Sequence, residues 1–251
     1  MKRIIYFSII ILLAFQGKAQ NFISKANIEF EVRTNIKKTM GSGSWEEMMK
    51  EQMPDFKTSY YDFTFADNKS IYKFNRWAEG KKMPEFMRKS EEENTWYFDH
   101  NSEKFYMLKT IYGSNFNVED SIPEIKWRLS NENRTIAGFN CRKAVGIIMD
   151  SVYVFAFFTE EIMISGGPCS ISGLPGMVLG LTIPRLYTSY IATKIMLNDV
   201  NISAIKPTTA KKYYTNASLR TALLERSSDW TDEDDPESNK WKEQFLWNAF
   251  L

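Results

Sequence analysis

The chain has 251 residues, of which 32 are basic and 31 acidic, and 43% of its residues are hydrophobic. This length fits one domain with a sizeable hydrophobic core. The balance of charge argues against a nucleic-acid-binding protein, which would present a strongly basic face.

Residues 1–19 have the pattern of a secretory signal peptide. A basic start precedes an apolar run over residues 4–15 that is too short to span a bilayer comfortably, and small residues follow it. We expect cleavage near Ala19/Gln20 and export to the periplasm or the outer-membrane periphery. Residues 20–251 are then expected to form a single β-rich domain without a transmembrane span.

Alternating apolar and polar residues predict β-strands along most of the remaining chain. The first strand runs through Ile28, Phe30 and Val32, and polar turns between later strands predict three hairpins. The hairpins are expected at 60–65 with 70–74, at 95–98 with 104–109, and at 134–148 with 152–159, followed by a strand at 188–197. The fold class that follows is mainly β (α+β): a large curved antiparallel β-meander sheet with a few helices.

Helices are expected at three places. A capping box at Ser44 and Glu47 precedes methionines at helical spacing, and Pro54 ends this amphipathic insert. A short helix is expected over 217–226. A C-terminal helix is expected over 236–250, where apolar residues gather on one face.

The segment 166–181 contains several backbone constraints close together. Pro175 fixes its φ near −65°, and Gly176 accepts a positive φ, so this pair predicts a type II turn. The apolar residues 178–181 then read as a buried strand.

Three short motifs follow one another in this part of the chain. They are IAGFNCRKA over 136–144, Gly167-Pro168, and GLPG over 173–176. In this order they resemble the GLPGLI family of secreted proteins from Gram-negative bacteria, although Met177-Val178 stands where the family name has Leu-Ile. We expect the motif residues to have a structural role, namely Gly138, Cys141, Gly167, Pro168, Cys169, Gly173, Leu174, Pro175 and Gly176.

The GLPGLI family occurs in bacteria that are rich in TonB-dependent receptors. The resemblance therefore implies a periplasmic or outer-membrane-associated protein that works with such a receptor or with another outer-membrane complex. It brings no catalytic residue and no cofactor with it.

The sequence gives little support to catalysis. His100 is the only histidine, so a Ser-His-Asp or Cys-His nucleophile system would depend on it alone. It lies in a predicted hairpin turn, where we expect a solvated side chain. We therefore expect a non-enzymatic accessory or binding protein, with a carboxylate-based hydrolase as a minor alternative.

A carrier of an apolar ligand is the main alternative. A curved antiparallel sheet with one or two covering helices can enclose such a ligand, as in periplasmic lipoprotein carriers, which is an analogy at the level of the fold. Six aromatic residues could line that face or form an ordinary core: Trp77, Trp96, Tyr97, Phe98, Phe105 and Tyr106.

The methionines and cysteines leave further alternatives open. Met49 with Met53, and Met83 with Met87, have helical spacing, and thioethers favour Cu(I), although methionine also serves as adaptable packing. Cys141 and Cys169 are the only cysteines. In an oxidising compartment we expect them to form either one disulfide or two buried thiols.

Overall fold

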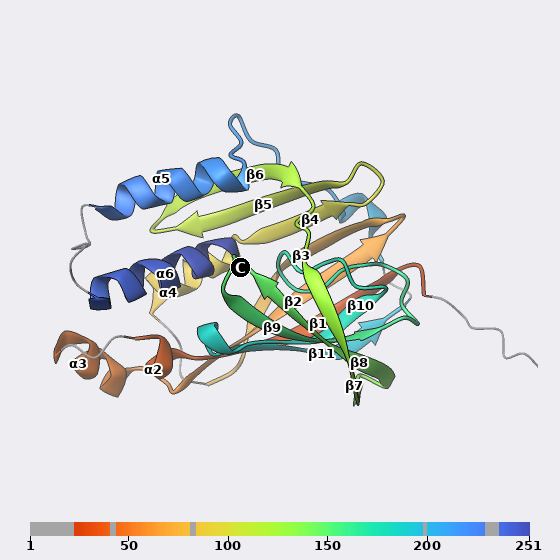
Figure 1. Cartoon of the computed structure of the whole chain (residues 1–251), viewed down its shortest axis with the longest axis horizontal. Helices are drawn as coiled ribbons and strands as arrows, with labels where there is room; N and C mark the ends of the chain where they lie inside the picture. The colour runs from red at the N-terminus through yellow and green to blue at the C-terminus, as the bar shows by residue number, and fades with distance from the viewer. Residues whose placement is uncertain (1–22, 41–43, 81–83, 198–199, 229–235) are drawn as a thin grey trace, which may run out of the picture.

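The structure, a computed structural model, describes residues 23–40, 44–80, 84–197, 200–228 and 236–251. The predicted signal peptide and its cleavage site lie outside this part, as does the lead into the capping box at Ser44. The described residues are mainly β, as predicted, and their strands form one open antiparallel sheet (Figure 1).

The sheet is a meander whose first and last strands pair in its middle. The strand order is β6-β5-β4-β3-β2-β1-β11-β10-β9-β8-β7, so the two edges are strands that follow one another in the chain. The strands are β1 Ala26–Asn35, β2 Phe56–Ala66, β3 Lys69–Trp77, β4 Thr95–Asp99, β5 Lys104–Ile111, β6 Ser114–Ser121, β7 Lys126–Ile136, β8 Phe139–Ile148, β9 Val152–Thr159, β10 Met177–Ile183 and β11 Thr188–Met196.

The helices lie mainly on the concave side of the sheet. Figure 1 shows α4 and α6 between the two halves of the sheet and α5 beside β6. The helices of the described residues are α2 Ile36–Thr39, α3 Ser44–Gln52, α4 Glu85–Glu92, α5 Asn216–Ser228 and α6 Pro236–Phe250, with short 3₁₀ turns η1 Pro184–Leu186 and η2 Ile202–Ala204. None of these helices is long and apolar enough to cross a membrane.

Most of the predicted hairpins are confirmed, and one strand needs correction. The residues 134–148, expected as one strand, are divided by a two-residue turn at Ala137 and Gly138, whose φ values are +49° and +87°. This pair of positive φ values is typical of a type I′ hairpin turn, which joins β7 to β8. The sequence pattern predicts neither β6 nor residues 126–133 of β7 as strand.

The turn at Pro175 also differs from the expectation. The N–H of Gly176 donates to the carbonyl oxygen of Leu174 at 2.8 Å, while the N–H of Met177 donates to Ile162 instead. This i to i+2 bond is that of a γ-turn around Pro175, and it replaces the predicted type II turn. The positive φ of Gly176 is confirmed at +147°.

The loop between β9 and β10 folds into the concave side and forms part of the core. Its residues Ile162, Ile171 and Leu174 are almost fully buried. A Cβ atom at Gly166 would lie 2.9 Å from the ring of Phe63 on β2, so the loop backbone lies directly against the sheet.

The segment after β11 covers the opposite face and one edge of the sheet. Ile205 packs with Tyr97 and Ile71 on the outer face. Tyr214 then pairs with the β6 edge, where its N–H donates to Asn117 and its carbonyl oxygen accepts from Glu119. This pairing blocks an edge that could otherwise recruit another strand.

The close approach at Gly176 gives a test of the fold. A Cβ atom there would lie 2.1 Å from the carbonyl oxygen of Thr159. We expect Gly176→Ala to lower the free energy of unfolding by about 3 kcal/mol or more, because backbone strain and the displacement of β9 add together. Urea unfolding measures the loss.

Gly138→Ala is the matched control. Its φ is also positive, but a Cβ atom would have nothing within 4 Å, so we expect a loss of about 1–2 kcal/mol from strain alone. Equal losses in the two variants would contradict the proposed contact with Thr159.

Candidate functional site

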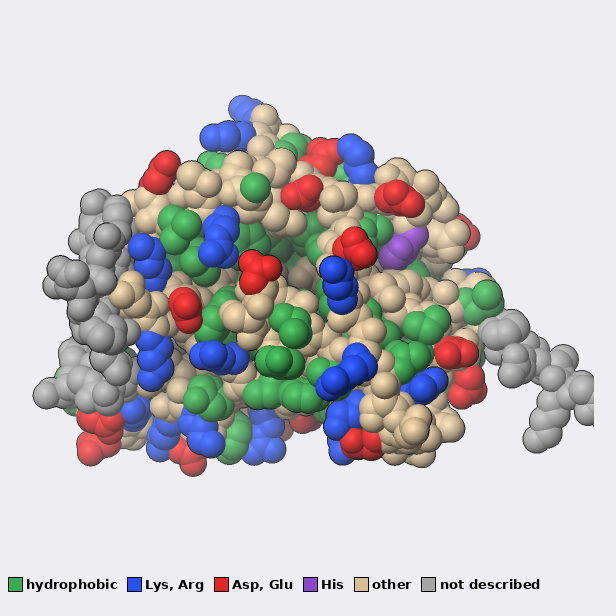
Figure 2. All heavy atoms as spheres, viewed as in Figure 1, with side chains coloured by type: hydrophobic (Ala, Val, Ile, Leu, Met, Phe, Trp, Pro, Cys, Tyr) green, Lys and Arg blue, Asp and Glu red, His purple; other side chains and the backbone are tan. Residues whose placement is uncertain are grey.

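The concave side of the sheet encloses a cavity that the core leaves unfilled. Its volume is about 1,040 Å³, and it lies between the strands, α4 and the end of α6. Figure 2 shows a hollow in this face, with hydrophobic side chains inside it and charged side chains around it.

Aromatic side chains from the sheet form much of the cavity wall. The rings of Tyr61 and Tyr72 stack with centroids 4.9 Å apart, and Trp96 lies 5.5 Å from Tyr72. The wall also includes Val32, Leu186, Tyr190, Phe245, Ala249 and Leu251. Such a surface binds apolar groups well because it is already desolvated and rigid.

Two polar atoms of this wall have no hydrogen-bond partner among the described residues. They are the hydroxyl of Tyr72 and the indole N–H of Trp96, on side chains that are 1% and 2% exposed. Leaving such a group unsatisfied costs about 1–3 kcal/mol. Both atoms are closed off from the cavity as well as from bulk solvent.

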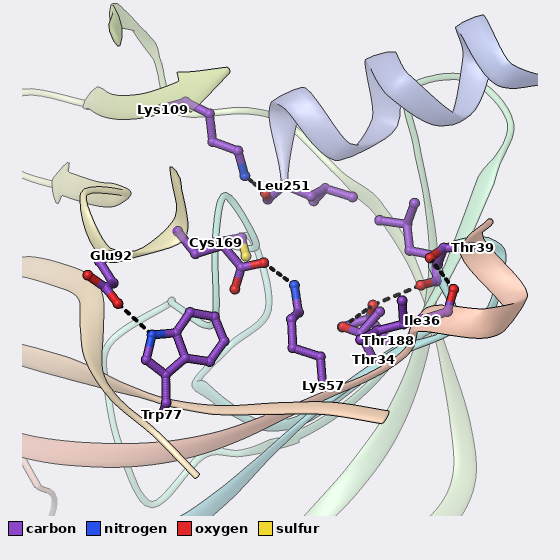
Figure 3. Close-up of polar contacts among 12 residues, drawn as sticks. Thr34, Ile36, Thr39, Lys57, Trp77, Glu92, Lys109, Cys169, Thr188 and Leu251 are labelled. Atoms are coloured by element: carbon purple, nitrogen blue, oxygen red, sulfur yellow. Dashed lines mark hydrogen bonds and ion pairs between the residues drawn. The ribbon is translucent and has the colours of Figure 1, made fainter. Parts of the chain in front are cut away.

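Two lysines point into the same space from opposite sides of it (Figure 3). Lys57 of β2 pairs with Glu91 of α4, and Lys109 of β5 donates to the main-chain oxygen of Leu251. Burial lowers the pKa of Lys109 to about 8, and the nearby charge of Lys57 acts in the same direction.

Helix α4 is tied to the sheet by side chains at its C-terminal end. Besides the ion pair of Glu91, the indole N–H of Trp77 donates to Glu92 at 2.6 Å (Figure 3). The Trp77–Glu92 bond is exposed and adds little to stability, whereas the side chains of the Lys57–Glu91 pair are only 20% and 24% exposed, so loss of one partner would be costly.

Both cysteines are free, buried thiols, which is the second of the two predicted alternatives, and they form no disulfide. Cys169 borders the cavity, and its Sγ lies 3.7 Å from the hydroxyl oxygen of Tyr190. Burial raises the pKa of each thiol, Cys141 and Cys169, to about 11.

The predicted aromatic face is only partly correct. Of its six residues, Trp96 lines the cavity and Trp77 anchors α4. Phe98 and Phe105 belong to the main core, whereas Tyr97 and Tyr106 pack on the outer face.

His100 is half-buried rather than solvated, which corrects the expectation. Its ring stacks on Phe98 with centroids 5.9 Å apart, and burial lowers its pKa. It borders a second hollow of about 870 Å³, which is more open to solvent and lined mostly by polar residues. The first cavity is the better ligand site because it is more enclosed.

The structure describes the side chains of only one of the two predicted methionine pairs. Met49 and Met53 form a small cluster with Ile36 and Met40, which is a packing role. Met83 and the side chain of Met87 lie outside the described part. Copper binding stays a prediction.

The motif residues lie in the turn before β8, in β8, and in the loop inside the sheet. A Cβ atom at Gly167 would lie 2.9 Å from that of Val178, so the second motif also sits directly against a strand. Two motif residues border a hollow. Cys169 borders the candidate cavity, and Gly173 borders the second, more open hollow.

Sequence reasoning missed the lysines and most of the tyrosines of the cavity. A signal was present in β5, where Phe105, Met107, Lys109 and Ile111 alternate with residues of the other face. A lysine at an inward position of an otherwise apolar face indicates a buried charge.

No family model and no curated protein matches the chain. Two structures of PNGF-II superpose with TM-scores of 0.50 and 0.51 at 11% sequence identity. The matches cover 82% of this chain but 33% and 32% of PNGF-II, so the chain spans about a third of that protein's length.

A further match is an uncharacterized conserved protein from Thermus thermophilus. It covers 82% of this chain and 97% of its own length, at 11% identity and a TM-score of 0.37. At these identities the likeness to PNGF-II shows a related fold and nothing about function.

The buried thiols give a test of the site. With a pKa of about 11, only about one thiol in a thousand is ionised at pH 8. We expect the folded protein to react very slowly with Ellman's reagent at this pH, and both cysteines to react at once in denaturant.

The measurement is the absorbance time course with and without guanidinium chloride. Rapid reaction of one thiol in the folded protein would contradict the enclosure of that residue. Failure of both thiols to react in denaturant would indicate that they are oxidised.

Proposed function

We propose that this protein is a non-enzymatic binding protein of the bacterial envelope that holds an apolar ligand in the cavity of its open sheet. The observation that carries the proposal is the cavity of about 1,040 Å³ on the concave side of the sheet, whose wall includes Tyr61, Tyr190 and Phe245.

The size of the cavity suits one extended ligand. Small-molecule sites usually enclose about 300–1,000 Å³, and the volume of about 1,040 Å³ lies at the upper end of that range.

Binding rather than catalysis also suits the chemistry of the cavity. Cys169 stays a thiol because burial raises its pKa, and its neighbour Tyr190 is no general base at neutral pH. The carboxylate of Glu91 is paired with Lys57.

The cellular setting of the proposal comes from the sequence. The signal-peptide pattern and the GLPGLI resemblance favour the periplasm or the outer-membrane periphery. Delivery of the ligand to a TonB-dependent receptor or another outer-membrane complex stays a prediction of that resemblance.

A neutral fluorescent probe tests the proposed function. We expect N-phenyl-1-naphthylamine to bind the wild-type protein with a rise in fluorescence, and Val32→Trp to weaken binding at least about tenfold by filling the cavity. The dissociation constant from fluorescence titration is the measurement.

Val145→Trp on the outward side of β8 is the matched control, and we expect it to bind the probe like wild type. Circular dichroism confirms that each variant is folded. If wild type and Val32→Trp bound the probe equally, or if wild type bound none, the proposed function would be wrong.

A further inference from the structure

The two halves of the sheet differ in how their outer face is covered. Over β3 and β4, the segment after β11 lies on this face, where Ile205 packs against Ile71 and Tyr97. Over β8 and β9, apolar side chains on the same face stay exposed, with Ile147 at 44% and Tyr153 at 54%. Ile147 and Tyr153 are direct cross-strand partners, so they form one apolar patch.

Two cations of the edge strand β7 lie beside this patch. Lys126 pairs in register with Ile147, and Arg128 pairs with Val145, so both cations share the face of the patch. Trp127 between them points to the concave side, where its indole N–H donates to the β9–β10 loop at 2.9 Å. Lys126 and Arg128 are both exposed to solvent.

Two further cations lie over aromatic rings of the same outer face. The guanidinium of Arg134 lies 4.6 Å from the ring centre of Phe157, and the ammonium of Lys143 lies 5.6 Å from that of Phe155. Phe157 pairs in register with Lys143, and Phe155 pairs with Val145. The outer face of β7, β8 and β9 therefore places cations directly beside apolar surface.

Most of this positive charge is not neutralised. Three of the four cations form no ion pair with a carboxylate among the described residues, and the fourth, Lys143, pairs with Glu132 at 2.6 Å. The turn that joins β8 to β9 adds one exposed carboxylate, Asp150. Positive charge therefore predominates around the patch, which favours an anionic partner.

The shape of the patch distinguishes between kinds of anionic partner. The patch lies on the outer face of the sheet, and neither of the two large hollows is lined by any of its residues. A peptide partner usually binds in a groove or along a strand edge. A lipid surface needs no groove, and its head-group region accepts basic and aromatic side chains side by side.

We propose that the outer face of β7, β8 and β9 docks on an anionic phospholipid surface. Lys126, Arg128 and Arg134 would lie against the lipid phosphates, and Ile147 and Tyr153 would enter the head-group region between them. This docking surface is separate from the cavity, so the inference does not depend on the proposed ligand.

Co-sedimentation with vesicles tests the docking surface. The vesicles contain phosphatidylcholine alone or phosphatidylcholine with about 30% phosphatidylglycerol, a lipid with an anionic head group. We expect at least about tenfold tighter binding to the anionic vesicles, because several cations contribute to attraction at such a surface. The affinity should fall as salt is added, because exposed charges are screened.

The double variant Lys126→Glu with Arg128→Glu tests the charges. We expect it to bind the anionic vesicles at least about tenfold more weakly than wild type. Lys206→Glu with Lys211→Glu is the matched control, because it has the same net charge but changes exposed residues of the segment after β11. The control should bind like wild type, and circular dichroism confirms that each variant is folded.

The double variant Ile147→Ser with Tyr153→Ser tests the apolar part and leaves every charge in place. We expect at least about fivefold weaker binding to the anionic vesicles, because less apolar surface enters the head-group region. Poly-L-glutamate serves as a soluble polyanion without apolar surface. It should bind more weakly than the anionic vesicles, and its binding should not change in this variant.

Several results would overturn the docking surface. They are no binding to anionic vesicles, equal binding to both kinds of vesicle, and equal losses in the two charge-reversal variants. Unchanged vesicle binding without Ile147 and Tyr153, or poly-L-glutamate binding as tight as that of the vesicles, would indicate an acidic macromolecule instead. The fluorescent probe of the cavity, titrated without vesicles, reports the proposed function separately.

Discussion

The pairing of β1 with β11 determines how the rest of the molecule is built. Because the ends of the meander meet in the middle of the sheet, the opening falls between β6 and β7. No strand among the described residues closes that opening, so the apolar concave face needs another cover. The β9–β10 loop provides one part, and α6 another. The cavity is the volume that these two covers leave between them and α4.

Much of the fold was predictable because its rules are local. Alternation identified β1 and the hairpin of β2 and β3, whose turn at Asp67 and Asn68 has the positive φ values that such turns favour. The strand β6 and most of β7 were missed because few of their residues are buried, so their sequences lack a clear apolar face. The turn between β7 and β8 was not predicted because it contains Ala137, and alanine rarely adopts a positive φ. The γ-turn at Pro175 depends on Ile162, a distant acceptor that no local rule supplies.

The candidate site was less predictable than the fold for the same reason. Trp96 was one of six aromatic residues, and strand alternation places it on the face opposite Tyr97, its neighbour in sequence, without showing which face lines a cavity. The inward position of Lys109 on β5 can be read from the sequence pattern. The pairing of Lys57 with Glu91 beside it cannot. These residues come from elements that are distant in sequence. Their proximity is a property of the assembled sheet, which a pattern along the chain does not contain.

The central position of β11 also bears on the order of folding. The strand β1 pairs on one side with β2, which is the next strand in the chain. On its other side it pairs with β11, which consists of residues 188–196 and lies far along the chain. Closing so long a loop costs conformational entropy. The resulting high contact order lowers the folding rate. The hairpins on each side can therefore form early as two separate halves. The concave cavity exists only after the late strand joins them, so a partly synthesised chain lacks it.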